Sequence, residues 1–276
     1  MDNVEATVEE FYGGRDVLAR VLAAVRAAGA DPDNLTPEDL YPIDQLHARG
    51  IAATREHADR AGVRPGMHIL ELGCGVGGAS RCLAAEKDCR VTGIDLTRTF
   101  VEVARDLTER CGLSDRIAYR QASALKLPFE DATFDHVWSC NVTMNIEDKA
   151  GLAREVARVL RPGCRFSCSE YLLGPAGEPS FPLPWAVDPS SSFLVTPAEM
   201  RRCLEEAGLE VVEQIDLTEA NLAFAREQRE RAERGEPPLR RPGVVSGDDI
   251  RPALQNAGKC IAEGRLVEQL TVAVKG

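Results

Sequence analysis

The segment ILELGCGVGGAS (residues 69–80) constrains the fold of this 276-residue chain more than any other stretch. It begins as an apolar strand pattern and ends as a helix start, with Gly73, Gly75, Gly77 and Gly78 in the turn between them. Glycines permit a sharp turn and let a ligand approach the backbone N–H groups, while the helix N-terminus favours an anionic group. The segment therefore predicts a strand–turn–helix unit that binds a small molecule.

Strand and helix patterns alternate along most of the chain. We expect strands at 67–72, 90–95, 116–121, 134–139, 164–173, 209–217 and 266–276. We expect helices at 17–29, 45–61, 76–87, 98–111, 148–160 and 196–208. This alternation predicts an α/β fold in which helices cover both faces of a mainly parallel sheet.

Two stretches interrupt this order. The first, near residues 173–195, is rich in Pro, Gly and Ser with aromatic residues between them, and the second, residues 218–264, is polar and helical around a Pro/Gly break. Both should emerge at the edge of the sheet where open α/β proteins bind ligands, so we expect two lid insertions. We expect residues 1–60 to form an N-terminal helical segment that contributes to this cap, and residues 61–276 to form the main domain.

The composition limits the partners. A net charge of −11 argues against nucleic acid or an anionic membrane surface, because binding to either relies on a basic face. The sequence shows no long apolar span and no signal-peptide pattern, and its nine scattered cysteines form no metal-binding spacing. We expect a cytoplasmic monomer or homodimer that acts on a small molecule, without a metal.

Asp95 completes a fingerprint with the glycine turn. Gly73, Gly75 and Gly78 satisfy GxGxxG, and Asp95 lies 95 − 73 = 22 residues beyond the first of them, at the end of the next expected strand. This arrangement fits NAD, and it fits S-adenosylmethionine equally well. Glu71 suits a ligand that carries an ammonium group and is awkward beside a pyrophosphate, so it favours S-adenosylmethionine.

Five ordered motifs then support a family. The series ELGCGVGG, GIDLT, ASALKLPF, ATFDHVWS and ARVLRPG resembles the class I S-adenosylmethionine-dependent methyltransferases over roughly residues 60–216. The resemblance implies a Rossmann-like, doubly wound seven-stranded sheet with an antiparallel last strand, N-terminal helices and a helical and loop cap. DQLHARG (44–50) and the C-terminal run IAEGRLVEQLTVAVKG resemble, more weakly, the sarcosine and dimethylglycine N-methyltransferases and related small-molecule enzymes.

The resemblance also implies a set of cofactor residues. Gly73, Gly75 and Gly77 would bring the backbone against the methionine and ribose parts of S-adenosylmethionine, with Glu71 beside the ammonium group. Asp95 would bind the ribose hydroxyls, and it also suits the N-cap of the following helix.

The adenine end is less regular. Ser123 and Ala124 stand where the family commonly has an acidic residue and a small one, so the usual acid is absent here. The Ser123 hydroxyl and the Ala124 N–H could still meet the adenine. Leu96 would lie against the ring or serve only as an apolar helix-start residue, and Cys140 would end the fourth strand beside the cofactor.

The exit of the fourth strand should face both the methyl donor and the acceptor. In the N-methyltransferases that the chain resembles, an acid would stand at Asn141 and a histidine at Asn145, with Met144 between them on the acceptor side. Neutral amides orient a substrate but accept no proton, so a base comes from elsewhere or is unnecessary. His47 and Tyr12 are the candidates to supply polar groups from the N-terminal segment, although a helical histidine is often only structural.

The acceptor side should include residues of the fifth strand and the first lid. Glu170 and Tyr171 end that strand at the expected pocket rim. Trp185 and Phe193 either form an aromatic wall around the acceptor or only anchor the lid. His57, among the charges of TREHADR, is expected in solvent.

These observations predict methyl transfer from S-adenosylmethionine to a small-molecule acceptor by positioned direct displacement, with nitrogen slightly favoured. A carbon or oxygen methyltransferase of natural-product metabolism and a non-catalytic S-adenosylmethionine-binding protein are the alternatives. A nicotinamide-dependent oxidoreductase is disfavoured by Glu71 and by the ordered motifs.

Overall fold

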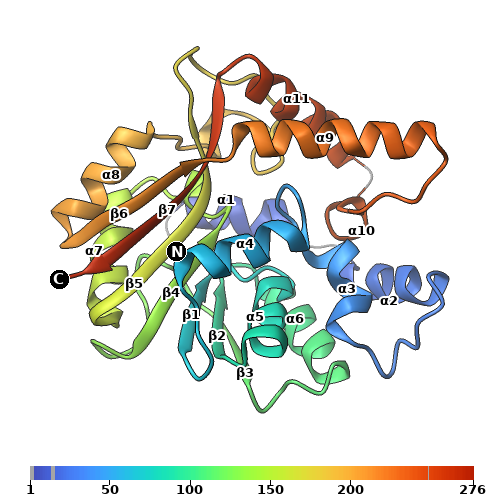
Figure 1. Cartoon of the computed structure of the whole chain (residues 1–276), viewed down its shortest axis with the longest axis horizontal. Coiled ribbons are helices and arrows are strands. Elements are labelled where there is room, and N and C mark those ends of the chain that lie inside the picture. Colours follow the sequence, from blue (N-terminus) through green and yellow to red (C-terminus); the bar gives the residue numbers. More distant parts are fainter. Residues whose placement is uncertain (1–2, 14–15, 248) are drawn as a thin grey trace.

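A seven-stranded sheet forms the centre of the computed structural model, which describes residues 3–13, 16–247 and 249–276 (Figure 1). The strands are β1 (His68–Leu72), β2 (Arg90–Asp95), β3 (Ile117–Gln121), β4 (Phe134–Cys140), β5 (Leu160–Leu173), β6 (Leu209–Asp216) and β7 (Leu266–Lys275). Their order across the sheet is β3-β2-β1-β4-β5-β7-β6. The first five are parallel, and β7 is antiparallel to both β5 and β6, which confirms the predicted fold class.

Helices precede, connect and cap these strands. They are α1 (Asn3–Tyr12), α2 (Val17–Ala27), α3 (Pro37–Asp44), α4 (Ile51–Ala61), α5 (Gly78–Lys87), α6 (Arg98–Arg110), α7 (Lys149–Val159), α8 (Pro197–Glu206), α9 (Thr218–Glu233), α10 (Gly243–Ser246) and α11 (Ile250–Ala262). Single 3₁₀ turns occur at η1 (Thr143–Asn145) and η2 (Pro189–Ser191). Within the described part of the chain, no helix is both long and apolar enough to cross a membrane.

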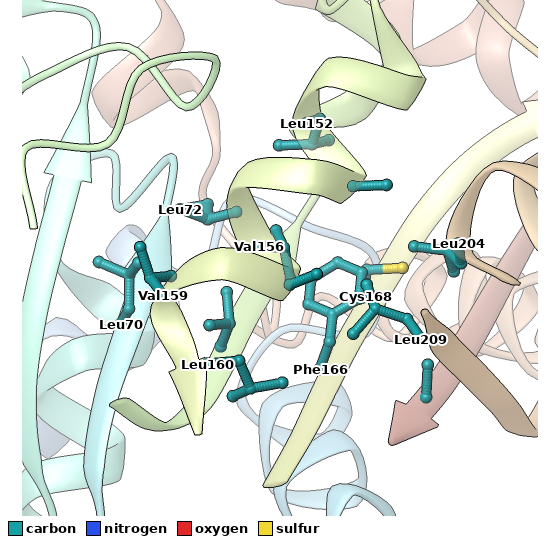
Figure 2. Packing of buried hydrophobic residues seen from close by; sticks show 14 of the residues in the cluster. Leu70, Leu72, Leu152, Val156, Val159, Leu160, Phe166, Cys168, Leu204 and Leu209 are labelled. Atoms are coloured by element: carbon teal, nitrogen blue, oxygen red, sulfur yellow. The ribbon is translucent and has the colours of Figure 1, made fainter. Parts of the chain in front are cut away.

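The main core lies between helix α7 and the sheet. Val156 and Val159 of α7 pack in one buried cluster with Leu70 of β1 and Phe166 of β5 (Figure 2). Truncating a buried aromatic of this kind to alanine costs about 3–5 kcal/mol. This packing fixes the positions of β1 and β5 relative to α7, and hence the positions of the loops at the carboxyl ends of the strands.

The predicted helix at 45–61 is wrong in its first third. Residues 45–50 form a non-helical connection between α3 and α4, in which Arg49 and Gly50 have φ values of 59° and 55°. Left-handed residues interrupt a right-handed helix, and glycine adopts this conformation without a side-chain penalty. The break lets the connection turn over the carboxyl end of the sheet.

The two predicted insertions contact each other. Residues 174–196 hold little regular structure, and Leu183 and Trp185 in this segment pack with Cys260 and Ile261 of α11 in one buried cluster. Figure 1 shows α9 and α11 lying across one end of the sheet. The division of the chain at residue 60 and the lid assignment stay predictions.

His57 is buried, so its expected exposure is wrong. Its ring stacks on Trp138 with centroids 3.5 Å apart, and its Nε2 lies 2.8 Å from Ser167 Oγ. His136 contacts the same hydroxyl at 2.8 Å from the sheet side. The charged neighbours of His57 occupy the outer face of α4, whereas the helical period turns His57 inward.

Candidate active site

A cavity of about 420 Å³ opens at the carboxyl ends of β1, β2, β4 and β5. Its walls come from α1, the 44–48 connection, the glycine turn, and both insertions. Of the predicted site residues, it is lined by Tyr12, His47, Glu71, Gly73, Gly75, Asp95, Leu96, Ser123, Ala124, Cys140, Asn141, Met144, Asn145, Tyr171 and Trp185. Gly77, Glu170 and Phe193 do not line it.

The glycine turn requires glycine at its first position. Gly73 has a φ of 61°, and a Cβ there would lie 2.4 Å from Val142 Cγ2, in the loop after β4. Gly75 has a φ of 51°, and its N–H donates to Asp95 Oδ2 at 2.8 Å. The turn is therefore held tightly between β2 and the β4 exit.

Asp95 is oriented by the backbone on two sides. Besides the bond from Gly75, its Oδ1 accepts a hydrogen bond from the Thr97 N–H at 2.8 Å, at the start of α6. Burial raises the pKa of this carboxyl, and these backbone donors partly oppose the rise. The N-cap of α6 is Thr97, so the expectation that Asp95 caps this helix is wrong, and its bond to the Thr97 N–H closes a turn before the helix. Ligand binding is compatible with these bonds, because each carboxylate oxygen has a further lone pair.

Glu71 lies on the floor of the cavity. It is 4% exposed, and the Ser80 hydroxyl donates to its Oε2. Burial raises the pKa of Glu71 to about 7, against the smaller opposing effect of the Ser80 bond. A cationic group beside Glu71 would stabilise the charged form that burial disfavours.

Glu5 supplies a carboxylate beside Ser123 that the sequence pattern does not reveal. The Ser123 hydroxyl donates to Glu5 Oε1, and both residues line the cavity. The acid that is absent at position 123 is thus replaced in space by one from α1. Only the docking of α1 against the loop after β3 reveals this, since the two residues are 118 positions apart.

Asn145 ties three segments together. Its Nδ2 donates to the carbonyl oxygens of Trp185 at 3.1 Å and Ser191 at 2.8 Å, and its Oδ1 lies 3.5 Å from the Tyr12 hydroxyl. The pKa of Tyr12 is raised by burial and by the nearby charge of Asp95, so this hydroxyl stays protonated. Asn145 and Tyr12 therefore join the β4 exit, the first insertion and α1.

Asn141 has an acceptor without a partner. It adopts a φ of 55°, and its Oδ1 is buried with no hydrogen bond among the residues that the structure describes. Unpaired buried acceptors are rare and call for an explanation. A ligand N–H or O–H in the cavity would satisfy this one. The neighbouring Cys140 stays a neutral thiol, because burial raises its pKa well above 9.0.

Both ring nitrogens of His47 lie within hydrogen-bond distance of protein oxygens. Its Nδ1 lies 3.0 Å from the Ala48 carbonyl oxygen and must donate to it, while Nε2 lies 2.9 Å from Thr54 Oγ1. Burial lowers the pKa of His47 to about 4, so the ring is neutral near pH 7. The structure thus gives His47 a place in the wall, with both nitrogens already engaged.

The three predicted residues outside the cavity have structural contacts. Glu170 accepts from Ser139 Oγ at 2.6 Å and from the N–H groups of Val142 and Thr143 at 2.8 and 2.9 Å, which fixes the β4 exit loop. The Phe193 N–H donates to the Met144 carbonyl at 2.7 Å.

Gly77 faces away from the cavity. With a φ of 84°, it lies where a Cβ would meet Tyr119 Oη at 2.4 Å and Arg81 Nη1 at 2.8 Å. Its glycine is therefore required by packing behind the turn, on the side opposite the ligand.

Two stacked aromatic rings line the cavity beside the carboxyl end of β5. The rings of Tyr171 and Trp185 stack with centroids 5.1 Å apart and an interplanar angle of 21°. Arg240, in the second insertion, also lines this part of the cavity. Its run LRRPG resembles an exposed basic turn, so no local sequence signal marks Arg240 as a site residue.

The fold and the cavity define a class of α/β proteins that hold a nucleoside-bearing ligand at the carboxyl ends of parallel strands. A family model described as a methyltransferase domain matches residues 70–168. The 27-O-demethylrifamycin SV methyltransferase of Amycolatopsis mediterranei (strain S699) is 34% identical over 213 residues, which cover 74% of this chain and 75% of that relative. The chain therefore belongs to the class I S-adenosylmethionine-dependent methyltransferases, and S-adenosylmethionine is its cofactor.

Other relatives match with different coverage. The methyltransferase GfsG of Streptomyces halstedii is 36% identical over 135 residues, so the match spans about half of each protein, 49% in both cases. The geranyl diphosphate C-methyltransferase of Streptomyces coelicolor A3(2) shares the fold with a TM-score of 0.72 at 20% identity, covering 99% of this chain and 98% of that one.

The finer resemblance to sarcosine and dimethylglycine methyltransferases is weak. A protein described by that activity, from Galdieria sulphuraria, matches with a TM-score of 0.63 at 18% identity, covering 82% of this chain and 84% of that one. That likeness concerns the fold alone.

Proposed function

We propose that this chain transfers a methyl group from S-adenosylmethionine to a small-molecule acceptor by direct displacement, without a general base from the protein. The observation that carries the proposal is the single cavity that joins the glycine turn and Asp95 to the aromatic wall of Tyr171 and Trp185. A cavity of about 420 Å³ lies in the range of small-molecule sites.

The residues at the carboxyl ends of β1 and β2 fit the cofactor. Asp95 is oriented to accept bonds from the ribose hydroxyls, and Glu71 offers a buried carboxylate to the ammonium group. Glu5 and Ser123 would contact the adenine, and Leu96 and Ala124 also line that region. S-adenosylmethionine supplies a methyl group on a sulfonium, which is a good leaving group.

The protein aligns the reactants and excludes water rather than transferring a proton. Asn141 and Asn145 are neutral amides, His47 has both nitrogens engaged, and burial keeps Tyr12 protonated. The acceptor must therefore bring its own lone pair, as a neutral amine or as an ionised oxygen or carbon acid. Effective alignment alone contributes several kcal/mol to such a reaction, roughly 7–11 kcal/mol in the best intramolecular cases.

The acceptor determines whether nitrogen, oxygen or carbon is methylated. The preference for nitrogen rests on the weak resemblance at the two ends of the sequence and stays a prediction. Oxygen and carbon are supported by the names of the relatives, which include a 27-O-demethylrifamycin SV methyltransferase and a geranyl diphosphate C-methyltransferase. A cavity in which Asn141, Asn145, His47 and Tyr12 supply no base accommodates each of these nucleophiles in its reactive form.

Calorimetric titration of the full chain with S-adenosylmethionine, its demethylated product and NAD tests the cofactor assignment. We expect binding of the first two and none of NAD. Incubation with S-adenosylmethionine labelled in its methyl group, with a panel of amines, phenols and carboxylic acids, tests transfer. If the chain binds the cofactor but transfers the methyl group neither to any acceptor nor slowly to water, a non-catalytic binding protein would be favoured.

A further inference from the structure

Arg240 reaches the cavity from the loop between α9 and α10. Its stem passes beside Gly50, where a Cβ would lie only 3.1 Å from Arg240 Cγ. Gly50 also has a φ of 55°, so glycine is favoured there for two reasons. The connection before α4 thus leaves a passage through which the guanidinium enters the cavity wall.

The guanidinium has no partner among the described residues. No ion pair or side-chain hydrogen bond involves it in that part of the chain, and its Nε is buried without an acceptor. Guanidinium groups carry five N–H donors, and partly buried ones normally pair with carboxylates or carbonyls. Arg240 therefore presents unused donors and a positive charge at the cavity.

Glu268, the acid that interacts electrostatically with Arg240, does not use these donors. Glu268 of β7 interacts electrostatically with Arg240, but its carboxylate accepts hydrogen bonds from Asn221 Nδ2 at 2.5 Å and Ser169 Oγ at 3.3 Å. This buried acid makes the positive charge of Arg240 less costly to bury. It leaves the N–H groups of the guanidinium available to a ligand.

Arg240 lies on the acceptor side of the sheet. Its charge acts on Tyr171 at the end of β5 and on Cys140 at the end of β4, whereas Asp95 ends β2. Because the strand order is β3-β2-β1-β4-β5-β7-β6, β5 and β7 are separated from β2 by β1 and β4. The guanidinium is thus displaced from the ribose side of the cavity.

Ile250 and Leu254 of α11 line the cavity together with Trp185. We infer that Arg240 binds an anionic oxygen group, such as a carboxylate, phenolate or enolate, on an acceptor whose apolar body packs against these three residues. This inference rests on the proposed function, because it names the class of acceptor for that same cavity. A guanidinium pairs with such oxygens through charge-assisted and often bidentate hydrogen bonds. It would repel a free ammonium group placed beside it.

The inference also accounts for the missing base. A positive charge favours the ionised form of a neighbouring acidic group, so the acceptor would enter as its anion without help from a protein base. The unsatisfied Oδ1 of Asn141 would then bind an N–H or O–H elsewhere on the same molecule or on the cofactor.

A pair of matched fluorescent probes tests this assignment on the full chain saturated with S-adenosylhomocysteine. Anilinonaphthalene sulfonate has an apolar aromatic body and one fixed negative charge, and phenylnaphthylamine has the same ring system without the charge. We expect the sulfonate to bind more tightly than the neutral probe. Arg240→Met should lower the affinity for the sulfonate probe by about tenfold and leave the affinity for the neutral probe unchanged.

Two variants complete the design. Arg240→Lys keeps the charge and should retain part of the preference for the sulfonate, and it guards against misfolding of the methionine variant. Arg241→Met removes the exposed neighbouring charge and should change the affinity for neither probe. Failure of the unaltered chain to bind S-adenosylhomocysteine would refute the proposed function itself.

The other outcomes bear on Arg240 alone. Equal binding of the two probes by the unaltered chain, or the same sulfonate affinity in Arg240→Met, overturns the inference while the cofactor site stands. A loss of S-adenosylhomocysteine affinity in Arg240→Met also overturns it, because it would assign the guanidinium to the cofactor carboxylate.

Discussion

The side-chain amide of Asn145 donates a hydrogen bond to the carbonyl oxygen of Trp185 at 3.1 Å. This contact joins the exit of β4 to the first insertion, and Trp185 in turn stacks on Tyr171 of β5. Asn145 thus helps to hold Trp185 against Tyr171.

Removing this link should loosen the cap without affecting the cofactor. Asn145→Ala loses two hydrogen bonds to the insertion, each contributing about 1 kcal/mol. We expect faster amide hydrogen exchange in residues 183–193, lower turnover once an acceptor is identified, and unchanged affinity for S-adenosylhomocysteine. Unchanged exchange together with weaker cofactor binding would move Asn145 into the cofactor site.

Asp95 should dominate cofactor affinity. Asp95→Ala removes an oriented carboxylate, and charge-assisted bonds to the ribose make the expected loss about 2 kcal/mol or more in calorimetric titrations with S-adenosylhomocysteine. Asp115→Ala, at an exposed position, is the matched control and should bind normally. Equal affinity in the two variants would remove the ribose assignment.

Gly73 should tolerate no side chain. Gly73→Ala places a Cβ 2.4 Å from Val142 Cγ2 on a backbone with a φ of 61°. Gly112→Ala is a control for the backbone alone, because Gly112 has a φ of 65° and no atom lies within 4 Å of its ideal Cβ. The strained φ should lower the unfolding free energy of both variants by about 1 kcal/mol, and overpacking should lower it by roughly a further 1–3 kcal/mol in Gly73→Ala. Urea unfolding would measure both, and equal losses would contradict the packing argument.

The buried histidines should make the fold acid-sensitive. Burial lowers the pKa of His136 to about 3, so between pH 6.5 and 3 the unfolded chain binds a proton that the folded chain does not. Unfolding free energy is then lost as the pH falls, by about 2 kcal/mol at pH 5 for one such group.

The comparison of variants isolates this effect. Glu71 contributes to the pH dependence of the unfolding free energy with the opposite sign. Its raised pKa of about 7 favours the folded state as the pH falls through 7 towards 4.5. In His136→Gln, the loss of unfolding free energy between pH 7.5 and pH 5 should be about 2 kcal/mol smaller than in the unaltered chain. His68→Gln, at a half-buried histidine, should show a smaller difference. Parallel pH profiles for all three proteins would refute the assignment.

The sequence by itself determined the sheet and the place of the glycine turn and Asp95 at the carboxyl edge of its strands. The glycine turn and Asp95 are local signals, because a turn with positive φ accepts little besides glycine and parallel strands bring their carboxyl ends to one edge. The antiparallel last strand followed from the family resemblance rather than from any residue pattern. The break before α4 escaped prediction because Arg49 carries a left-handed φ without any residue-type signal.

Only the tertiary structure decided which side chains share the cavity. Glu5 replaces the acid missing at Ser123 because α1 docks across the sheet edge, and Arg240 enters because Gly50 leaves space for its stem. Glu170 and Gly77 turn to structural partners for the same reason, since orientation depends on neighbours far away in sequence. Periodicity assigns a residue to an element, whereas the packing of distant elements decides what that residue touches.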